Sequence, residues 1–378
     1  MKNVVMYEKE NSTKHVLILC NTYYQIMFAI QLKEFIFPND SVDIGITDQT
    51  KGSLRIVNNF YKINVFHNCY YIECKELEES KTRKMKIQKL SSALFHNSEF
   101  ELLFKNKNYD NLLYFNSSYS TVAIFNILVH NNSKLLCSRF EEGILSYNTE
   151  LHERGNHSFG RFLDTLFKIR HFLGKPNIID NIGNFYCFYP ELYKLNFTPV
   201  EVPQFSNNSI NIITKVFDVK KENCYINEKY IFFSSVYDFE GEEPIGEFEI
   251  IKKIANIVGI DNLIIKKHPR DNRDVFEKAG IHVAKVSNLP WEVCQLCCDY
   301  SNHILISISS GSLLTINSSI ENPITSYYLF PCCHYQKNSI AKISVNAIEN
   351  LFNNPNMKMK LRNIKIVSDI KDIFENNG

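Results

Sequence analysis

Short apolar runs alternate with amphipathic stretches along the first 140 residues of the chain. HVLILC (15–20) is a continuous apolar run, which is typical of a strand buried in a parallel sheet. In residues 21–37 the apolar side chains recur at helical spacing, so a helix should follow this strand. Further strands are predicted for SVDIGITD (41–48), NLLYFN (111–116) and SKLLCSRF (133–140). Strand, polar loop and helix in this order predict an α/β domain.

The same rhythm returns in the second half, after a weaker region at about 176–230 in which DVKKENCYINEK (218–229) resembles a linker. Strands are then predicted for KYIFFSSV (229–236), NLIIKKHP (262–269), IHVAKV (281–286) and HILISIS (303–309). Helices are predicted for 243–259, for 270–280 closed by Gly280, for 289–300 and from 310 onward. We therefore expect two Rossmann-like domains, residues 1–220 and 221–378, which face each other across a cleft.

Composition narrows the class of protein. Hydrophobic residues make up 44% of the 378 positions and charged residues 22%, as in soluble globular proteins. Lys and Arg number 42 against 41 Asp and Glu, and this balance disfavours a nucleic-acid partner. The N-terminus lacks the features of a signal peptide, and no apolar run is long enough to span a membrane. We therefore expect a cytoplasmic protein.

The 11 cysteines have no regular spacing, which disfavours a disulfide framework. The closest approach to a metal pattern is Cys294, Cys297 and Cys298, but no CxxC pair answers them at zinc-like spacing. Buried free thiols are the better interpretation, and we expect no bound metal.

Three polar features fall at predicted strand ends in the second half, where ligands of open α/β sheets bind. The segment KKHPR places His268 and its neighbours at one strand end, and Glu292 begins the helix after the next strand. SISSGS ends a third strand and supplies small hydroxylated residues that suit a phosphate group. A histidine can neutralise such a phosphate or protonate it, and a carboxylate can hold a ribose diol. Together these features predict a nucleotide-phosphate site. No GxGxxG, Walker-type loop or DxD occurs, which disfavours dinucleotides, P-loop chemistry and metal-dependent sugar-nucleotide enzymes.

Each of these residues also suits an ordinary structural role. Ser309 and Ser310 suit a helix N-cap, His268 suits a loop, and Glu292 is a first-turn glutamate favoured by the helix dipole. The nucleotide interpretation gains from the order in which the three features follow one another along neighbouring strands.

KKHPR, PWEVC and SISSGS resemble the His-Pro motif, the ribose-binding glutamate and the Ser-Ser/Thr motif of bacterial sialyltransferases with the GT-B fold. The opening LILCNTYYQIMFAI is similar to glycosyltransferase family 52, which contains lipooligosaccharide and capsule sialyltransferases. RFEEGILSY (139–147) is similar to an acidic motif shared with polysialyltransferases.

The resemblance implies a metal-independent, inverting transfer of sialic acid from CMP-sialic acid to a glycan acceptor, with no further cofactor. His268 would meet the CMP phosphate and act as general acid, and Glu292 would bind the ribose. The remaining donor-site residues implied are Ser309, Ser310, Gly311, Lys267, Pro269 and Arg270. Lys267 and Arg270 would add positive charge around the phosphate.

Two regions could supply the base that takes the proton from the acceptor hydroxyl. Glu141 and Glu142 lie in the acidic motif, where Gly143 would allow a tight turn, and Asp238 follows the first strand of the second half. Family 52 relies on an aspartate in the latter region. We favour Glu141 and keep Asp238 as the rival, and a solvated loop carboxylate explains either one equally well.

The first half offers polar residues at strand ends that could bind sugar hydroxyls: Asn21, Thr22, Gln25, Asn116 and Ser117. The amphipathic stretch 160–175 carries Arg161, Lys168, Arg170 and Lys175, and could lie on the inner face of an anionic membrane that presents a lipid-linked acceptor. A core-facing helix with a basic outer side is the more common arrangement. The resemblance also implies a homodimer.

Two other functions remain open. A related GT-B enzyme could use a UDP-hexose, because neither the His-Pro nor the Ser-Ser motif fixes the donor sugar. A non-catalytic glycan-binding relative is the third interpretation, which the carboxylates at 141, 142 and 238 disfavour.

Overall fold

The computed structural model describes residues 13–79, 82–95, 99–147, 159–193, 195–238, 245–268, 270–284, 289–315, 324–336 and 339–375. Pro269 and parts of the segments predicted at 243–259, 281–286 and 310–320 lie outside these residues. Two compact units are present, and each is built around its own β-sheet.

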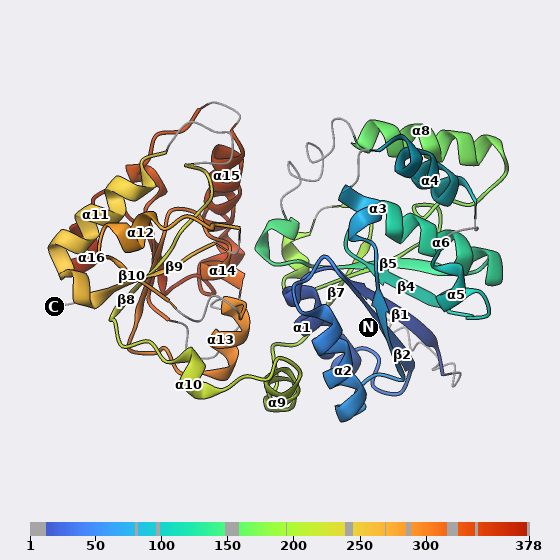
Figure 1. The fold of residues 1–378 in the computed structure, drawn as a ribbon, viewed down its shortest axis with the longest axis horizontal. Helices are drawn as coiled ribbons and strands as arrows, with labels where there is room; N and C mark the ends of the chain where they lie inside the picture. Colours follow the sequence, from blue (N-terminus) through green and yellow to red (C-terminus); the bar gives the residue numbers. More distant parts are fainter. Residues whose placement is uncertain are drawn as a thin grey trace, which may run out of the picture. The chain divides into compact units, whose positions relative to one another are not determined.

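The first sheet has seven strands in the order β3-β2-β1-β4-β5-β6-β7, and its neighbours from β3 to β6 pair in parallel. Its strands are β1 (His15–Cys20), β2 (Ser41–Thr47), β3 (Asn68–Ile72), β4 (Asn111–Tyr114), β5 (Leu136–Phe140), β6 (Ile182–Cys187) and β7 (Thr198–Glu201). The helices between them are α1 (Tyr23–Phe35), α2 (Ser53–Ile63), α3 (Lys75–Glu79), α4 (Arg83–Leu94), α5 (Glu101–Phe104), α6 (Tyr119–Asn131) and α8 (Phe159–Phe172). Figure 1 shows α1 and α2 on one side of this sheet and α5 and α6 on the other.

The first sheet is buried on both faces. Val16 to Ile18 of β1 have no exposed surface, which explains why this strand is a continuous apolar run. On one face Phe28 of α1 stacks on Phe140 of β5, with ring centroids 6.0 Å apart. On the other face, side chains of α6 such as Phe125 join the buried cluster.

The second sheet has six parallel strands in the order β10-β9-β8-β11-β12-β13. Its strands are β8 (Tyr230–Phe233), β9 (Leu263–Lys266), β10 (His282–Val283), β11 (Ile304–Ser307), β12 (Ser326–Tyr328) and β13 (Ile364–Ile366). The helices of this half are α9 (Asn207–Val216), α10 (Lys221–Cys224), α11 (Glu247–Val258), α12 (Val275–Lys278), α13 (Trp291–Cys297), α14 (Ser312–Thr315), α15 (Ile340–Phe352) and α16 (Asp372–Glu375).

Both sheets therefore start from a central strand, extend to one side through the next two strands, and then cross to the other side. This is the doubly wound Rossmann order. Two such domains in one chain are the GT-B architecture, so the predicted α/β fold class is confirmed. The cleft between the domains stays a prediction.

Two segments differ from the sequence-based expectation. The region 176–230, where the pattern weakens, contains β6, β7, α9 and α10. The helix predicted for 270–280 is wrong in length, because α12 covers only Val275–Lys278. Gly280, with φ of 75°, does end it, since few residues other than glycine adopt this backbone conformation.

The second unit is made of more than the C-terminal half of the chain. It includes residues from Pro203 onward together with earlier segments that contain Glu141 and Cys187. The boundary predicted at residues 220 and 221 stays a prediction.

Candidate functional site

The strand order of the second sheet reverses between β8 and β11, and open α/β sheets bind ligands at this reversal, beyond the carboxyl ends of the strands. Three predicted segments lie at these ends. KKHPR follows β9 next to β8, SISSGS follows β11, and Asp238 follows β8 itself.

The end of β8 is hydrogen-bonded to both neighbours. The backbone N–H of His268 donates to Oγ of Ser234 (3.2 Å). On the other side, the hydroxyl of Ser307 donates to the carbonyl of Phe233 (3.0 Å) and accepts from the N–H of Ser310 (3.0 Å). The structure thus brings the His-Pro and Ser-Ser segments together at one edge of the sheet.

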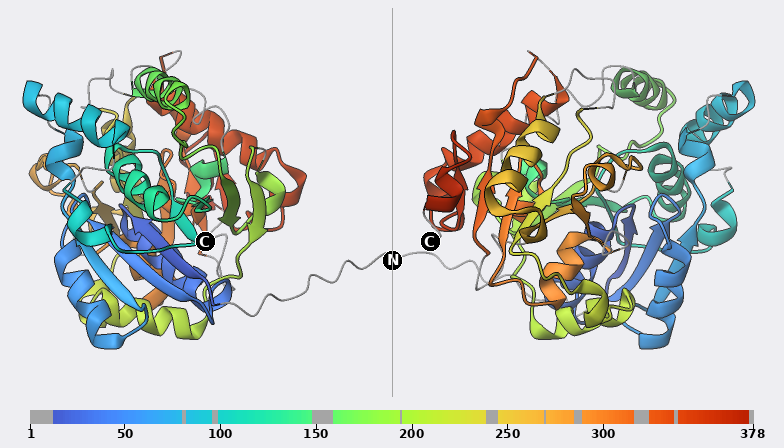
Figure 2. Two further views of the ribbon diagram at one scale, coloured as in Figure 1. Left: turned by 90° about the vertical axis from the view of Figure 1, so that its right-hand side faces the viewer. Right: turned by 60° about the vertical axis from the view of Figure 1, so that its left-hand side comes forward.

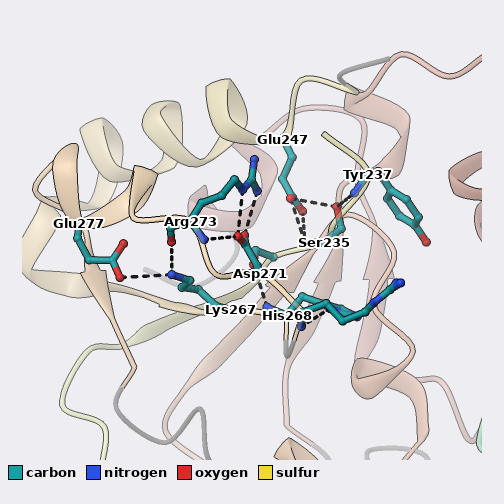
Figure 3. Close-up of polar contacts among 10 residues, drawn as sticks. Ser235, Tyr237, Glu247, Lys267, His268, Asp271, Arg273 and Glu277 are labelled. Atoms are coloured by element: carbon teal, nitrogen blue, oxygen red, sulfur yellow. Dashed lines mark hydrogen bonds and ion pairs between the residues drawn. The ribbon is translucent and has the colours of Figure 1, made fainter. Parts of the chain in front are cut away.

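His268 is oriented by a tight turn. Its carbonyl accepts from the N–H of Asp271 (2.8 Å), and its ring Nδ1 accepts from the N–H of Arg270 (3.2 Å). Figure 3 shows the imidazole in this turn. Since a backbone N–H can only donate, Nδ1 is the acceptor nitrogen and the proton of the neutral ring is on Nε2. Pro269 lies outside the described residues.

Two of the cations around His268, Arg273 and Lys267, are paired with carboxylates. Arg273 binds Asp271 through two parallel hydrogen bonds, Nε to Oδ1 (3.0 Å) and Nη2 to Oδ2 (2.9 Å). Burial raises the pKa of Asp271, but the bonds from Arg273 outweigh this and lower it overall. Lys267 donates to the carbonyl of Arg273 and lies 3.4 Å from the Glu277 carboxylate (Figure 3). The predicted contribution of Lys267 to the field around a phosphate is therefore partly neutralised.

Glu292 lies beside the Ser-Ser segment, because its Oε1 accepts from the hydroxyl of Ser312 (2.9 Å). Trp291, the first residue of α13, fixes this position. Its ring packs edge-on against Phe233 at the end of β8, with centroids 4.8 Å apart. The carboxylate is thus held next to the Ser-Ser motif, and its role in binding a ribose stays a prediction.

The segment after β11 retains hydrogen-bonding capacity. The Ser309 hydroxyl is buried and has no hydrogen-bond partner among the described residues. Leaving a buried polar group without a partner is costly, and a bound ligand can supply the partner that the protein does not. At Gly311 an added Cβ would meet no atom of the described residues within 4 Å, apart from the two chain neighbours, so these residues leave space beside the backbone. These features suit the approach of a phosphate group.

The first residue of α11 supplies a carboxylate that the sequence analysis missed. Glu247 is 2% exposed, and its carboxylate accepts from the N–H (2.9 and 3.0 Å) and the hydroxyl (3.0 Å) of Ser235 (Figure 3). Burial raises the pKa of Glu247 to about 8, the Ser235 bonds oppose this, and the nearby Asp238 charge adds to it. The base candidate Asp238 accepts from the N–H of Ile245 (2.8 Å) and so holds the loop between β8 and α11.

The acidic motif after β5 is anchored rather than loosely solvated. Glu141 is 2% exposed, and its Oε2 accepts from the N–H of Phe188 (2.8 Å) and from the hydroxyl of Tyr147. The N–H of Glu142 donates to Oγ of Ser146 (2.7 Å). Gly143 has φ of 77°, so the predicted tight turn is present. A solvated loop carboxylate does not describe Glu141.

The first-loop candidates form a local network at the carboxyl end of β1. Thr22 caps α1 by accepting from the N–H of Gln25 (3.3 Å), and Gln25 accepts from the N–H of Asn21 (2.6 Å). Asn21 in turn accepts from the hydroxyl of Thr47 (3.0 Å). Their predicted contact with sugar hydroxyls stays a prediction.

Asn116 and Ser117 follow β4, which is next to β1 at the strand reversal of the first sheet. The polar residues that follow β1 and those that follow β4 therefore lie at the same strand reversal of the first sheet. No group of His, Cys, Asp or Glu in the described part of the chain is arranged to hold a metal ion.

The arrangement in the second sheet combines an orientated imidazole, a buried hydroxyl without a partner among the described residues, space beside Gly311 and a nearby carboxylate. These groups could bind a nucleotide phosphate together with its sugar. The sequence signal for them is a set of short motifs at successive strand ends.

The family model described as alpha-2,8-polysialyltransferase (POLYST) matches residues 16–329. No curated protein matches the chain. Similar solved structures include Acinetobacter baumannii MurG, with 10% identity and a TM-score of 0.45 over 96% of this chain and 89% of that one. The Streptomyces sp. SF2575 glycosyltransferase SsfS6, complexed with thymidine diphosphate, has 11% identity and a TM-score of 0.44, with coverage of 96% and 99%. UDP-GlcNAc 2-epimerase from Neisseria meningitidis, bound to UDP-GlcNAc, has 15% identity and a TM-score of 0.43 at the same coverage. At these TM-scores the likeness carries no weight for function.

Proposed function

Because the chain belongs to the alpha-2,8-polysialyltransferase family and is thus a glycosyltransferase, we propose that it transfers sialic acid from CMP-sialic acid to a glycan acceptor. The transfer inverts the anomeric configuration and uses no metal ion. A closer relationship to glycosyltransferase family 52, with a lipooligosaccharide or capsule acceptor, is part of the proposal.

The observation that carries the proposal is the cluster at the strand reversal of the second sheet. Three separate segments supply this cluster, which consists of His268, Ser309 and the Glu292–Ser312 pair. Packing and hydrogen bonds fix these segments at the ends of β8, β9 and β11. A nucleoside monophosphate presents an anionic phosphate and a ribose diol to just these kinds of groups.

In the proposed reaction the acceptor hydroxyl attacks the anomeric carbon of sialic acid, and the bond from that carbon to the CMP phosphate oxygen breaks. The base, Glu141 or its rival Asp238, takes the hydroxyl proton. His268 donates its Nε2 proton to the departing phosphate oxygen or neutralises its charge. Ser309 and the open backbone at Gly311 hold the phosphate, so the protein supplies the stabilisation that a divalent cation gives in other transferases.

The test is a calorimetric comparison of CMP, UMP, UDP and GDP, each with EDTA. We expect CMP to bind more tightly than UMP, and sialyl transfer to continue in EDTA. Tighter binding of UDP would favour the related UDP-hexose transferase, and a strict need for a divalent ion would refute the metal-free mechanism. CMP binding without any transfer or donor hydrolysis would favour the glycan-binding relative.

We also propose that α8 contacts an anionic membrane, where a lipid-linked acceptor would be presented. The exposed fractions of Ile169, Phe172 and Leu173 at the end of α8 are 40%, 88% and 50%. Figures 1 and 2 show α4 on the same side of the first sheet as α8. Exposed apolar side chains next to a lysine, here Lys168, are typical of interfacial helices. No helix in the described ranges is long and apolar enough to cross a bilayer.

One basic residue predicted for that surface lies elsewhere. Arg170 is 3% exposed and donates to the carbonyls of Leu94 and Pro176. Lys175 also donates to the Leu94 carbonyl (3.2 Å) and lies over the Phe95 ring. The assignment of Arg170 to the outer side is therefore wrong, because the Arg170 side chain connects α8 to the end of α4.

A further inference from the structure

The cysteines at the end of α13 are joined in space by a cysteine from a distant part of the chain. Cys294 and Cys298 are four residues apart, so their side chains lie on the same side of α13. Cys224 ends α10, and its thiol is hydrogen-bonded with the thiols of both Cys294 and Cys298. Three sulfur atoms from two separate segments therefore meet. They form no metal-binding arrangement among the described residues.

Hydrogen bonds outside the thiols hold the end of α10 against the chain that follows α13. The Tyr300 hydroxyl donates to the carbonyl of Cys224 (2.6 Å), and Nε2 of His303 donates to the carbonyl of Ile226 (3.1 Å). The Tyr300 ring also packs on that of Trp291, the first residue of α13, with centroids 4.6 Å apart. The contact among the thiols is therefore fixed by the surrounding backbone and rings.

The three thiols differ in exposure and in acidity. The exposed fractions of Cys224 and Cys294 are 1% and 0%, whereas Cys298 is partly exposed. The hydrogen bond from Cys294 lowers the pKa of the Cys224 thiol, burial opposes this, and the hydrogen bond from Cys298 lowers the pKa further. Because the thiolate is the nucleophilic form of cysteine, Cys224 is the sulfur prepared to attack, and Cys298 is the sulfur that a small solute reaches.

We propose that Cys224 and Cys298 are an oxidation site, at which a small peroxide converts the two thiols into a disulfide that joins α10 to α13. The Cys298 sulfur attacks one oxygen of hydrogen peroxide, the O–O bond breaks, and a sulfenic acid and one water form. The Cys224 sulfur then attacks the Cys298 sulfur. The S–O bond breaks, the S–S bond forms, and the hydroxyl leaves with the Cys224 proton as a second water.

The disulfide would close a loop that contains much of the candidate nucleotide site. Residues 224–298 include β8, β9 and α13, and therefore also His268 and Glu292. A cross-link across so long a segment stabilises the folded state, in the chain-entropy account, by restricting the unfolded chain. Oxidation should therefore raise the melting temperature by roughly 5 °C, and dithiothreitol should reverse the rise.

The experiment treats the reduced full-length chain with hydrogen peroxide, blocks the remaining thiols and maps disulfide-linked peptides by mass spectrometry. The wild type should yield one peptide pair, joined through Cys224 and Cys298, that dithiothreitol separates. In Cys224→Ser the second step cannot occur, so dimedone, which reacts with sulfenic acids, should label Cys298. The melting temperature of this variant should not rise on oxidation.

Cys297→Ser is the matched control. Cys297 is also a partly exposed cysteine of α13, but its sulfur lies 3.2 Å from the Thr214 hydroxyl of α9. This variant should form the disulfide and gain stability as the wild type does. If it does neither, the cysteines of α13 are not distinguished in the way proposed, and the assignment of Cys298 is wrong.

A wild-type chain whose thiols survive peroxide would overturn the inference, as would a link from Cys224 to Cys294 or to any other cysteine. An unchanged or lower melting temperature of the cross-linked chain would refute the stabilising effect. Mapping the wild type needs no variant, so the test stands even if Cys224→Ser fails to fold. No readout uses a nucleotide or a sugar, so the proposed function stands or falls separately.

Discussion

The backbone N–H of Arg270 donates to Nδ1 of His268 at 3.2 Å. This contact keeps the acceptor nitrogen of the ring inside its own turn and leaves Nε2 as the protonated nitrogen of neutral histidine. An imidazole held in this tautomer can donate a proton outward without first reorienting.

Replacement of His268 by alanine should lower kcat by roughly 10²-fold or more, the usual effect of removing a general acid. The fold should survive, because the backbone N–H and carbonyl of His268 keep their hydrogen bonds to Ser234 and Asp271. Steady-state kinetics and a thermal melt check both points. His282→Ala is the matched control, since His282 is half-exposed, pairs with Glu228 (3.0 Å) and lies on the edge strand β10. Near-normal turnover of His268→Ala would return this residue to the status of an ordinary loop histidine.

Substitution of Gly311 by alanine tests the phosphate site by steric blocking. The added methyl group meets no atom of the described residues within 4 Å, apart from the chain neighbours, so the melting temperature should hardly change. A phosphate at this backbone would collide with the methyl group, and CMP affinity should fall by roughly tenfold or more. Calorimetry measures the affinity. Unchanged CMP binding would mean that the phosphate lies elsewhere.

Glu247 should make stability depend on pH. Its folded pKa of about 8 exceeds the ordinary value of 4.5, so the folded chain binds the proton more tightly than the unfolded chain. The resulting stabilisation is complete below pH 4.5 and is lost as the pH rises through about 8. Asp238, whose charge raises this pKa, and Arg273, whose charge lowers it, face the group.

Glu247→Gln cannot ionise, so its melting temperature relative to wild type should rise between pH 5 and pH 9. Thermal melts across this range provide the measurement. A constant difference between the two proteins would show that Glu247 is ionised throughout.

The two base candidates are separated by isosteric variants. Glu141→Gln should lower kcat by roughly 10²-fold while CMP affinity stays within about threefold, because a base acts only on the acceptor. Asp238→Asn should have the smaller effect, since Glu141 and not Asp238 lies in the acidic motif that resembles the polysialyltransferase motif. If Asp238→Asn is the inactive variant and Glu141→Gln is not, the assignment reverses. Normal transfer by both would exclude both carboxylates as the base.

Membrane contact by α8 is tested with vesicles that contain anionic phospholipid. Phe172→Glu should reduce co-sedimentation several-fold, because it replaces an apolar side chain with a charge that the lipid repels. Ile257→Glu changes a similarly exposed apolar residue on α11 (49%) and should bind as wild type does. Equal binding by all three proteins would contradict the membrane proposal.

Strands with continuous apolar sequences were predictable, and the exposed edge strand β7 was not. β1, β8 and β11 lie within the predicted ranges because burial on both faces demands such runs. β7 (TPVE) was missed because it is a largely exposed edge strand that contains proline. The helix at 270–280 was predicted too long because the bidentate Asp271–Arg273 pair stabilises a turn where helical periodicity suggested a helix.

Site residues were also predictable only where a local sequence pattern marks them. Short motifs located His268 and Ser309 at the reversal of the sheet, since strand ends can be inferred from the sequence. Glu247 could not be found this way, because a glutamate in the first turn of a helix is common and its burial depends on tertiary packing.

The chain enters the second compact unit, leaves it twice and returns each time, because the segments that contain Glu141 and Glu191 belong to that unit although they precede Pro203. Expression of residues 203–378 alone would therefore omit part of what they pack against, including the Glu191 partner of Lys360 (3.0 Å). During synthesis these earlier segments must wait for the C-terminal part of their unit, and no single cut yields two complete halves. A split protein should regain activity only when both fragments are refolded together.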